Sequence, residues 1–344
     1  MFSSLFSAFL LNIFALFNLL GIRNDLMQIQ IIFLFISLVI FILARKLGLN
    51  FFRSNAKFFY WLFIFILVIT YIIGIEVKGS KRWIDLYFFN FQPSEFFKIF
   101  FVVFLADYFT RHKKTISEFS TFLKSLGYLF IPLLIVFKQP DLGNAMVLLF
   151  IYGVVVLFSG IPKRYLLYSA LILFMVLPVG WFTLKDYQKN RITSFVNPEI
   201  DQQGINYNMT QAVITVGSGN FLGRGLGYGT QSKLFFLPEN HTDFAFSSLI
   251  EQFGFLGGFL ILFFYFIISL GLIRKLIIHF QSVDEDSLFK RLLILGFFSY
   301  FIFQVFVNIG MNLGLLPIAG IALPLISYGG SSLVSFMLGL ALVL

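Results

Sequence analysis

A cluster of charged and polar side chains interrupts the apolar sequence between residues 74 and 98, which reads GIEVKGSKRWIDLYFFNFQPSEFFK. Pro93 suits the first turn of a helix, so Glu95 and Lys98 lie three residues apart on one helical face. Charges inside a membrane-spanning helix cost about 2.5 to 3.5 kcal/mol each, so they normally face a partner or a wet cavity. The pair either neutralises itself or belongs to a site. The candidate site residues in this stretch are Arg82, Trp83, Gln92, Ser94, Glu95 and Lys98.

A second cluster, KQPDLGNA, lies between two apolar stretches and contains Asp141. An aspartate just before a helix accepts hydrogen bonds from the free N–H groups of its first turn. Its position at the outer ends of two predicted spans equally suits a site residue. The spacing leaves both interpretations of Asp141 open.

A long polar insertion runs from residue 184 to residue 243, too polar to span a membrane and too long for an ordinary connection. Its glycines, in GSGNFLGRGLGYG, indicate tight turns or close approach to a ligand. They resemble a nucleotide phosphate loop only superficially, because no GKS or GKT follows. The candidate substrate-binding or site-shaping residues of the insertion are Arg191, Gln211, Ser218, Lys233, Glu239, His241 and Thr242.

Asp243 closes the insertion at the predicted membrane boundary. A carboxylate between water and apolar walls can have its proton affinity raised into the range that suits a general base. The alternative is a simple helix cap. The chain has no Cys, which excludes a thiolate nucleophile and a Cys-ligated metal. A histidine metal site is disfavoured because the predicted topology separates the three His residues. A hydrolase is disfavoured because neither a GxSxG nor an HExxH motif occurs.

The composition indicates that most of the chain lies in a lipid bilayer. Of the 344 residues, 59% are hydrophobic and 12% charged, and the mean hydropathy is +0.91. These values are typical of an integral membrane protein. We therefore predict an all-α polytopic protein with ten transmembrane helices and a long extracytoplasmic loop between helices 7 and 8. The predicted spans are 3–22, 28–46, 57–75, 93–110, 122–138, 142–160, 164–183, 244–272, 291–312 and 318–342.

The loop charges predict the orientation. Fourteen Lys and Arg residues fall on one side of the predicted bundle and five in the short loops of the other, so the first side is cytoplasmic, with both termini. The net charge of +9 is then a topology signal, and nucleic-acid binding is not expected. No linker or repeat divides the chain, so we expect one domain over residues 1–344, with the loop of residues 184–243 facing outward. The stretch to Phe52 has few polar residues and is expected to be scaffold.

The clusters together resemble the SEDS family (shape, elongation, division and sporulation) of peptidoglycan polymerases. The matching motifs lie in the family's order between residues 74 and 335, and the stretches GTQS and NIGM look more RodA-like than FtsW-like. Asn220 departs from the pattern, because the family has glycine there. The motifs are KGSKRWI, FQPSEFFK, KQPDLGNA, GSGNFLGRGLGYGTQSKLFFLPENHTDF and LPLISYGGSS.

This resemblance implies an enzyme of the bacterial inner membrane that polymerises lipid II into a nascent glycan strand during cell-wall elongation. A class B penicillin-binding protein would act as its transpeptidase partner. The acceptor sugar's 4-hydroxyl would attack the donor's anomeric carbon with inversion and expel undecaprenyl diphosphate. Asp243 would be the general base, and a divalent cation, Mg²⁺ or Mn²⁺, could supplement the positive charges near the diphosphate. The residues implied to supply those charges are Arg82, Lys98 and Arg191.

Two other functions suit some of the same features. A transporter (flippase) of lipid II would also need many spans, charges at membrane depth and broken helices. The stretch GLLPIAGIALPLISYGGSS indicates either such a broken helix or tight packing of small residues. A division-specific FtsW-type polymerase or a non-enzymatic scaffold would share the composition, but only catalysis requires Asp243.

Overall fold

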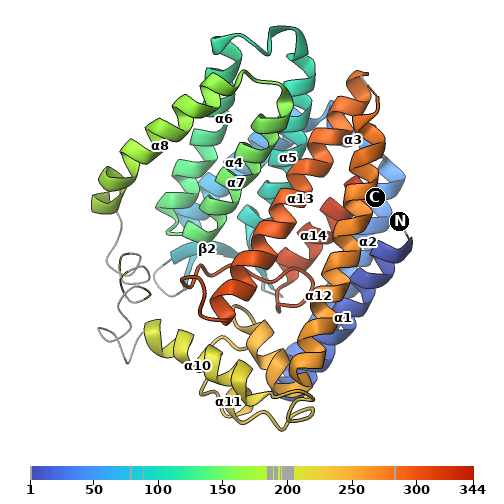
Figure 1. Ribbon diagram of the computed structural model, residues 1–344, viewed down its shortest axis with the longest axis vertical. Helices are drawn as coiled ribbons and strands as arrows, with labels where there is room; N and C mark the ends of the chain where they lie inside the picture. The colour runs from blue at the N-terminus through green and yellow to red at the C-terminus, as the bar shows by residue number, and fades with distance from the viewer. Residues whose placement is uncertain are drawn as a thin grey trace.

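The computed structural model describes residues 2–77, 80–87, 89–183, 189, 193, 195, 205–282 and 284–344. Of residues 77, 172–174, 176–181, 183 and 205 it describes the backbone alone. Within this part of the chain the protein is a bundle of long helices (Figure 1). Seven of the described helices are long and apolar enough to cross a membrane, which confirms the prediction of a polytopic helical membrane protein. They are α1 (Phe2–Ile22), α2 (Asn24–Leu47), α4 (Ala56–Ile73), α6 (Phe119–Lys138), α7 (Leu142–Ser159), α12 (Ala245–Phe280) and α13 (Glu285–Asn312).

Three further helices fall on predicted spans, two of them over nearly the whole span and α14 over its second part. α5 (Pro93–Arg111) begins at the expected proline and is buried along almost its whole length, so it forms the centre of the bundle. α8 (Lys163–Thr183) lies beside α7 with few contacts, and α14 (Gly330–Val343) packs mainly on α2. The shorter helices are α3 (Leu49–Ser54), η1 (Lys113–Thr115), α10 (Ile205–Ser218) and α11 (Thr230–Lys233).

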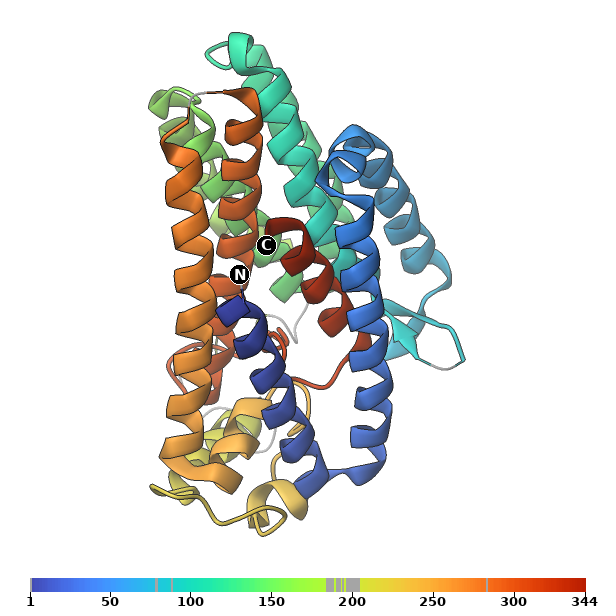
Figure 2. The same cartoon turned by 90° about the vertical axis from the view of Figure 1, so that its right-hand side faces the viewer.

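The fold is not purely helical, because residues between α4 and α5 form a small antiparallel sheet. Its strands are β1 (Ile75–Val77), β2 (Ser80–Asp85) and β3 (Asn90–Phe91), in the order β1-β2-β3. β2 pairs with both neighbours, and its residues contact α4 and α5. Figure 2 shows this hairpin projecting from the side of the bundle. The sheet holds the described part of the polar cluster of residues 74–98 at the start of α5.

The long helix α12 is broken at Gly254, whose φ of 70° and ψ of −168° are not helical. The glycine-rich segment, which we define as residues 219–236, fills this break. Its backbone pairs with α12 through four hydrogen bonds: Arg224 N to Glu251 O, Gly225 N to Gln252 O, Phe255 N to Asn220 O, and Leu256 N to Phe221 O, between 2.8 and 3.2 Å long. Asn220 has a φ of 48°, a conformation that glycine adopts freely and asparagine tolerates, which explains the departure from the family pattern.

Two sequence predictions of secondary structure need correction. The predicted span 318–342 is helical only from Gly330, and residues 318–329 form an irregular segment beside the polar insertion. Pro324 and a Leu325 with a φ of 67° lie in this irregular segment, and neither conformation suits a continuous helix. The insertion predicted as a loop contains α10 and α11 within its described part.

Candidate active site

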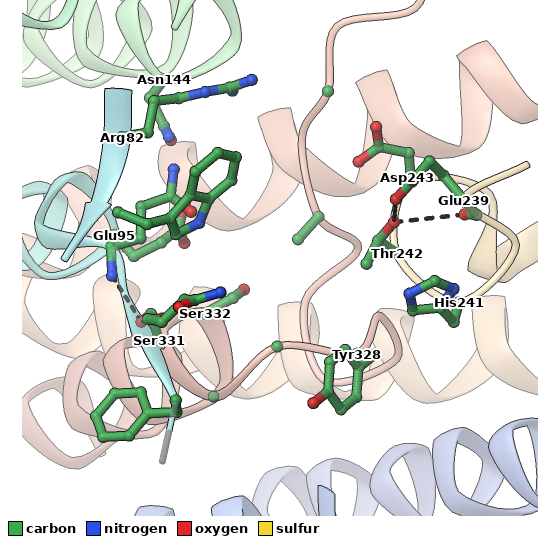
Figure 3. Close-up of a pocket in the computed structure, with 18 of the residues that line it drawn as sticks. Arg82, Glu95, Asn144, Glu239, His241, Thr242, Asp243, Tyr328, Ser331 and Ser332 are labelled. Atoms are coloured by element: carbon green, nitrogen blue, oxygen red, sulfur yellow. Dashed lines mark hydrogen bonds between the residues drawn. The ribbon is translucent and has the colours of Figure 1, made fainter. Parts of the chain in front are cut away.

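A cavity of about 750 Å³ lies between the small sheet, the start of α5 and the end of the polar insertion. Figure 3 shows its two walls: Arg82, Glu95 and Asn144 lie on one side, and Glu239 and Asp243 on the other. The cavity therefore brings together residues far apart in the sequence. The predicted site residues that line it are Arg82, Trp83, Gln92, Glu95, Glu239, His241, Thr242 and Asp243.

Arg82 extends from β2 into the first wall. Its guanidinium lies 3.4 Å from the Asp141 carboxylate, donates to the Ser80 hydroxyl at 2.8 Å, and lies 5.0 Å from the centre of the Trp83 ring. This arrangement holds a cation at the cavity while Asp141, which is fully buried, balances its charge from behind.

Asp141 is both a cap and a partner of the site. It accepts hydrogen bonds from the backbone N–H of Asn144 at 3.3 Å and from its side chain at 2.9 Å, at the start of α7. It also accepts a hydrogen bond from the Gln92 side chain at 3.2 Å. Ser94 is buried behind the wall and accepts a hydrogen bond from the Asn144 side chain at 3.2 Å. Asp141 and Ser94 thus hold the residues that line the cavity.

Glu95 and Lys98 form the ion pair expected from their spacing, with 2.7 Å between Oε1 and Nζ. Lys98 is 0% exposed, does not line the cavity, and lies 4.9 Å from the centre of the Tyr300 ring. Glu95 lines the cavity, and its Oε2 accepts no hydrogen bond within the described part of the chain. Lys98 therefore acts on the site through Glu95.

The second wall is the turn that ends the insertion. Glu239 has a φ of 53°, and its carboxylate accepts a hydrogen bond of 2.8 Å from the Thr242 hydroxyl. The backbone N–H groups of Thr242 and Phe244 both donate to the Glu239 carbonyl, at 3.2 and 3.1 Å. This compact turn presents the side chains of Glu239 and Asp243 to one cavity.

Three consecutive carbonyls of this turn are held by the carboxyl-terminal part of the chain. The carbonyl of His241 accepts from the backbone N–H of Tyr328 at 2.8 Å, and that of Thr242 from the Ser327 hydroxyl at 2.6 Å. The carbonyl of Asp243 accepts two hydrogen bonds of 3.1 Å, from the side-chain amides of Asn308 and Asn312. The backbone that carries Asp243 is thus anchored on α13 and on residues 327 and 328.

An aromatic row connects the two walls along one side of the cavity. The ring centres of Phe89 and Phe33 are 5.8 Å apart, those of Phe33 and Tyr328 are 6.2 Å apart, and those of Tyr328 and His241 are 5.8 Å apart. Phe33 comes from α2, so the amino-terminal region also supplies part of the cavity lining and is more than scaffold. Burial raises the pKa of Tyr328, which therefore remains a neutral phenol.

The sequence predictions missed Glu251, a fully buried carboxylate in α12. It accepts hydrogen bonds from the backbone N–H of Gln231 at 2.8 Å, and from the backbone N–H and hydroxyl of Ser232 at 2.9 and 2.6 Å. The carbonyl of Ser232 in turn accepts a hydrogen bond of 2.6 Å from the side chain of Asn240, next to the site. Glu251 is the single acid inside the predicted span 244–272, and the cost of burying a charge could have identified it.

Other predicted site residues lie away from the cavity. Gln211 belongs to α10, Ser218 ends that helix 3.5 Å from the Glu251 carboxylate, and Lys233 is exposed on α11. Asn208 of α10, which the predictions omitted, does line the cavity. Arg191 lies outside the described residues.

Comparison with known proteins agrees with this architecture. The sequence profile of the family described as cell cycle protein, which is named after FtsW, RodA and SpoVE, matches residues 3–344. The peptidoglycan glycosyltransferase MrdB of Escherichia coli K12 is 36% identical over 310 residues, which cover 90% of this chain and 82% of MrdB. The probable peptidoglycan glycosyltransferase FtsW of Buchnera aphidicola subsp. Schizaphis graminum is 37% identical over 314 residues, or 91% of this chain and 87% of that protein.

Two solved structures share the whole fold. A chain of a peptidoglycan synthase complex that coordinates polymerization and crosslinking has a TM-score of 0.82 and 28% identity, and the match covers 100% of this chain and 96% of that one. The rod shape determining protein RodA of Thermus thermophilus has a TM-score of 0.70 and 26% identity, with coverage of 100% and 95%. The family profile, the sequence identities and the shared fold agree, and this chain belongs to the SEDS family of FtsW, RodA and SpoVE proteins.

Proposed function

We propose that this protein is a peptidoglycan glycosyltransferase that joins lipid II-linked disaccharide units into a glycan strand. The observation that carries this proposal is the cavity whose walls hold Asp243 on one side and Arg82 on the other. An inverting transfer between two sugars needs a base on the attacking face and positive charge at the leaving diphosphate. The two walls supply these two kinds of group.

Asp243 is the general base in this proposal. Its carboxylate would take the proton of the acceptor's 4-hydroxyl while that oxygen attacks the anomeric carbon of the donor. The hydrogen bonds from Asn308 and Asn312 hold its backbone, so little reorganisation is needed when the substrates bind. No water is consumed, and undecaprenyl diphosphate leaves.

The distribution of charge supports one orientation of the substrates. Glu239 and Asp243 would repel a diphosphate, whereas Arg82 on the opposite wall would attract it. The first turn of α14, with Ser331 and Ser332, lies on the same side as Arg82 in Figure 3. We therefore place the donor's diphosphate beside Arg82 and the acceptor sugar beside Asp243.

A divalent cation has no assigned step in this mechanism. Among the described residues, no three His, Asp or Glu side chains are grouped closely enough to hold a metal ion. A Mg²⁺ or Mn²⁺ ion would therefore take part of its ligands from the substrate's diphosphate, and it would supply charge neutralisation there.

The membrane arrangement completes the proposal. We infer that α5, α8 and α14 cross the membrane along with the seven long apolar helices, which makes ten spans in one domain. The excess of Lys and Arg in the loops on one side supports a topology with both termini in the cytoplasm and the cavity at the outer leaflet of the bacterial inner membrane.

We also infer the elongation branch, with a class B penicillin-binding protein as partner. The identities of 36% to MrdB and 37% to FtsW do not separate the branches. The RodA-like motifs in the sequence and the likeness to Thermus RodA support elongation. The likeness to a chain of a peptidoglycan synthase complex supports a transpeptidase partner.

The test is polymerisation of lipid II by the purified protein, alone and with a class B penicillin-binding protein, with glycan products resolved on a gel. We expect Asp243→Asn to lower the rate by about 10²- to 10⁴-fold, the usual contribution of a general base. Glu118→Gln, at an exposed residue before α6, is the matched control and should polymerise at the wild-type rate. Equal product from folded Asp243→Asn would refute the mechanism.

The same variants separate polymerase from flippase. Vesicles that contain labelled lipid II report transbilayer movement without any polymerisation. Transport that persists in Asp243→Asn, with no glycan made by the wild type, would favour the transporter.

A further inference from the structure

The glycine-rich segment, residues 219–236, exposes large apolar side chains although it belongs to the polar insertion. Phe221, Leu222, Tyr228 and Phe235 are 63%, 72%, 77% and 54% exposed. We propose that this segment lies in the headgroup region of the lipid leaflet on the cavity side and anchors the site to the membrane surface. Exposed apolar surface of this extent on a membrane protein calls for a covering partner, and we identify it as lipid.

The segment continues the lipid-facing surface of α12. Phe221 stacks on Phe255 with 5.9 Å between ring centres, and Phe255 stacks on Phe259 at 6.5 Å. Phe255 and Phe259 are 60% and 54% exposed on a helix that is apolar enough to span the membrane. The row of rings thus passes without interruption from the membrane helix to the segment.

The depth of the segment follows from the length of α12. From Phe255 to Phe280 this helix is about 39 Å long at 1.5 Å per residue. The hydrocarbon core is about 30 Å thick, so the first turn after Gly254 lies near the border between core and headgroups. The glycine-rich segment is paired with that turn and lies at the same end of the bundle as α10 (Figure 2).

The charges of the segment suit an anionic lipid surface. It contains Arg224 and Lys233, both exposed, and no Asp or Glu occurs between residues 219 and 238. Cations interleaved with aromatic and aliphatic side chains are typical of segments that bind the membrane interface. A docked protein would need neither the continuity with α12 nor the excess of positive charge.

The contacts of the segment connect the leaflet to the site. Four backbone hydrogen bonds fix it in the break of α12, and Ser232 is held by the buried Glu251. Ser232 also accepts the hydrogen bond from Asn240, three residues before Asp243. An anchored segment therefore sets the height of the catalytic turn above the hydrocarbon core, where a lipid-linked substrate carries its diphosphate.

Site-directed spin labelling tests this inference, because the chain has no native cysteine. Labels at Leu222→Cys and Phe235→Cys are compared with a lipid-facing control, Phe259→Cys, and an aqueous control, Lys114→Cys in η1. The protein is reconstituted without partners in nanodiscs of phosphatidylethanolamine and phosphatidylglycerol. The measured quantity is the ratio of collision rates with O₂ and with a water-soluble nickel complex.

We expect this ratio at residues 222 and 235 to exceed that at residue 114 several-fold and to approach that at residue 259. Replacing phosphatidylglycerol by phosphatidylcholine should lower the ratio at residue 222 in the wild-type background but not in Arg224→Gln/Lys233→Gln. Ratios equal to that of residue 114 would overturn the inference. Ratios that rise only after a penicillin-binding protein is added would also overturn it and identify a protein interface. The measurement needs no catalytic activity, so it stands apart from the test of Asp243.

Discussion

The side chain of Asn312 donates a hydrogen bond of 3.1 Å to the backbone carbonyl of Asp243. Its amide orientation is fixed by Ser247, whose backbone N–H and hydroxyl donate to the Asn312 Oδ1 at 3.0 and 2.6 Å. The amide can therefore present only its N–H₂ group to the turn. Asn308 makes the second bond to the same carbonyl, so α13 positions Asp243 although neither asparagine lines the cavity.

Asn312→Asp should lower kcat of lipid II polymerisation by about 10²-fold with little change in KM, because a misplaced catalytic group costs rate rather than binding. Aspartate keeps the shape of the side chain but has no N–H to donate. Asn12→Asp is a matched control at a buried asparagine, since in the described part of the chain the Asn12 amide donates only to the Ala8 carbonyl within α1. A kcat equal to that of Asn12→Asp would show that the bond does not position Asp243.

Glu251→Gln should loosen the glycine-rich segment. In the wild type, backbone N–H groups of this segment donate to the Glu251 carboxylate, and in the variant an amide N–H₂, which cannot accept, would replace one of its oxygens. Hydrogen bonds to a charged group contribute about 1.5 to 3 kcal/mol each. Hydrogen exchange of residues 219–233 should accelerate by at least tenfold. Ser218→Ala, which removes a 3.5 Å contact with Glu251 and a hydrogen bond to the Thr215 carbonyl within α10, is the control and should leave exchange of residues 219–233 unchanged.

Gly254→Ala should destabilise the protein strongly. An alanine Cβ at this position would overlap the backbone nitrogen of Gly223, and the φ of 70° with ψ of −168° is a conformation that only glycine adopts without strain. Such strain costs about 1 to 3 kcal/mol before the overlap is counted. Gly153→Ala in α7, where a Cβ meets no atom within 4 Å, should instead be neutral or slightly stabilising. Thermal unfolding in detergent measures both.

Lys98→Met should destabilise the bundle by about 3 to 5 kcal/mol, because it leaves the Glu95 carboxylate buried without its partner. Glu95→Gln combined with Lys98→Met should recover most of the lost stability, since neither position then carries a buried charge that lacks its partner. Equal stability of the single and double variants would mean that the two charges do not depend on each other.

Tyr328→Phe should leave the alkaline limb of the pH–rate profile unchanged up to about pH 10, the ordinary pKa of a tyrosine. Burial raises the pKa of Tyr328, so its phenol loses a proton only above that range. A shift of the limb below pH 10 in the variant would contradict this assignment.

The sequence by itself determined the class of the protein and much of its site. Hydropathy is a local property of composition, so most of the long helices fell where they were expected. Polar residues are costly in apolar surroundings, so they stand out in the sequence, and this identified Asp243, Arg82 and Glu95 as candidates. Family motifs added the reaction that such residues suit.

Only the tertiary structure decided which polar groups share one cavity. Lys98 turned away from it and Asp141 lies behind it, because side-chain direction depends on packing between helices rather than on spacing along one. The break at Gly254 lies inside an apolar run and was not predicted. The backbone carbonyls that the break leaves free accept hydrogen bonds from a segment about thirty residues earlier in the chain. Glu251 and Asn312 likewise acquire their roles from hydrogen bonds to distant backbone, and no local pattern encodes those bonds.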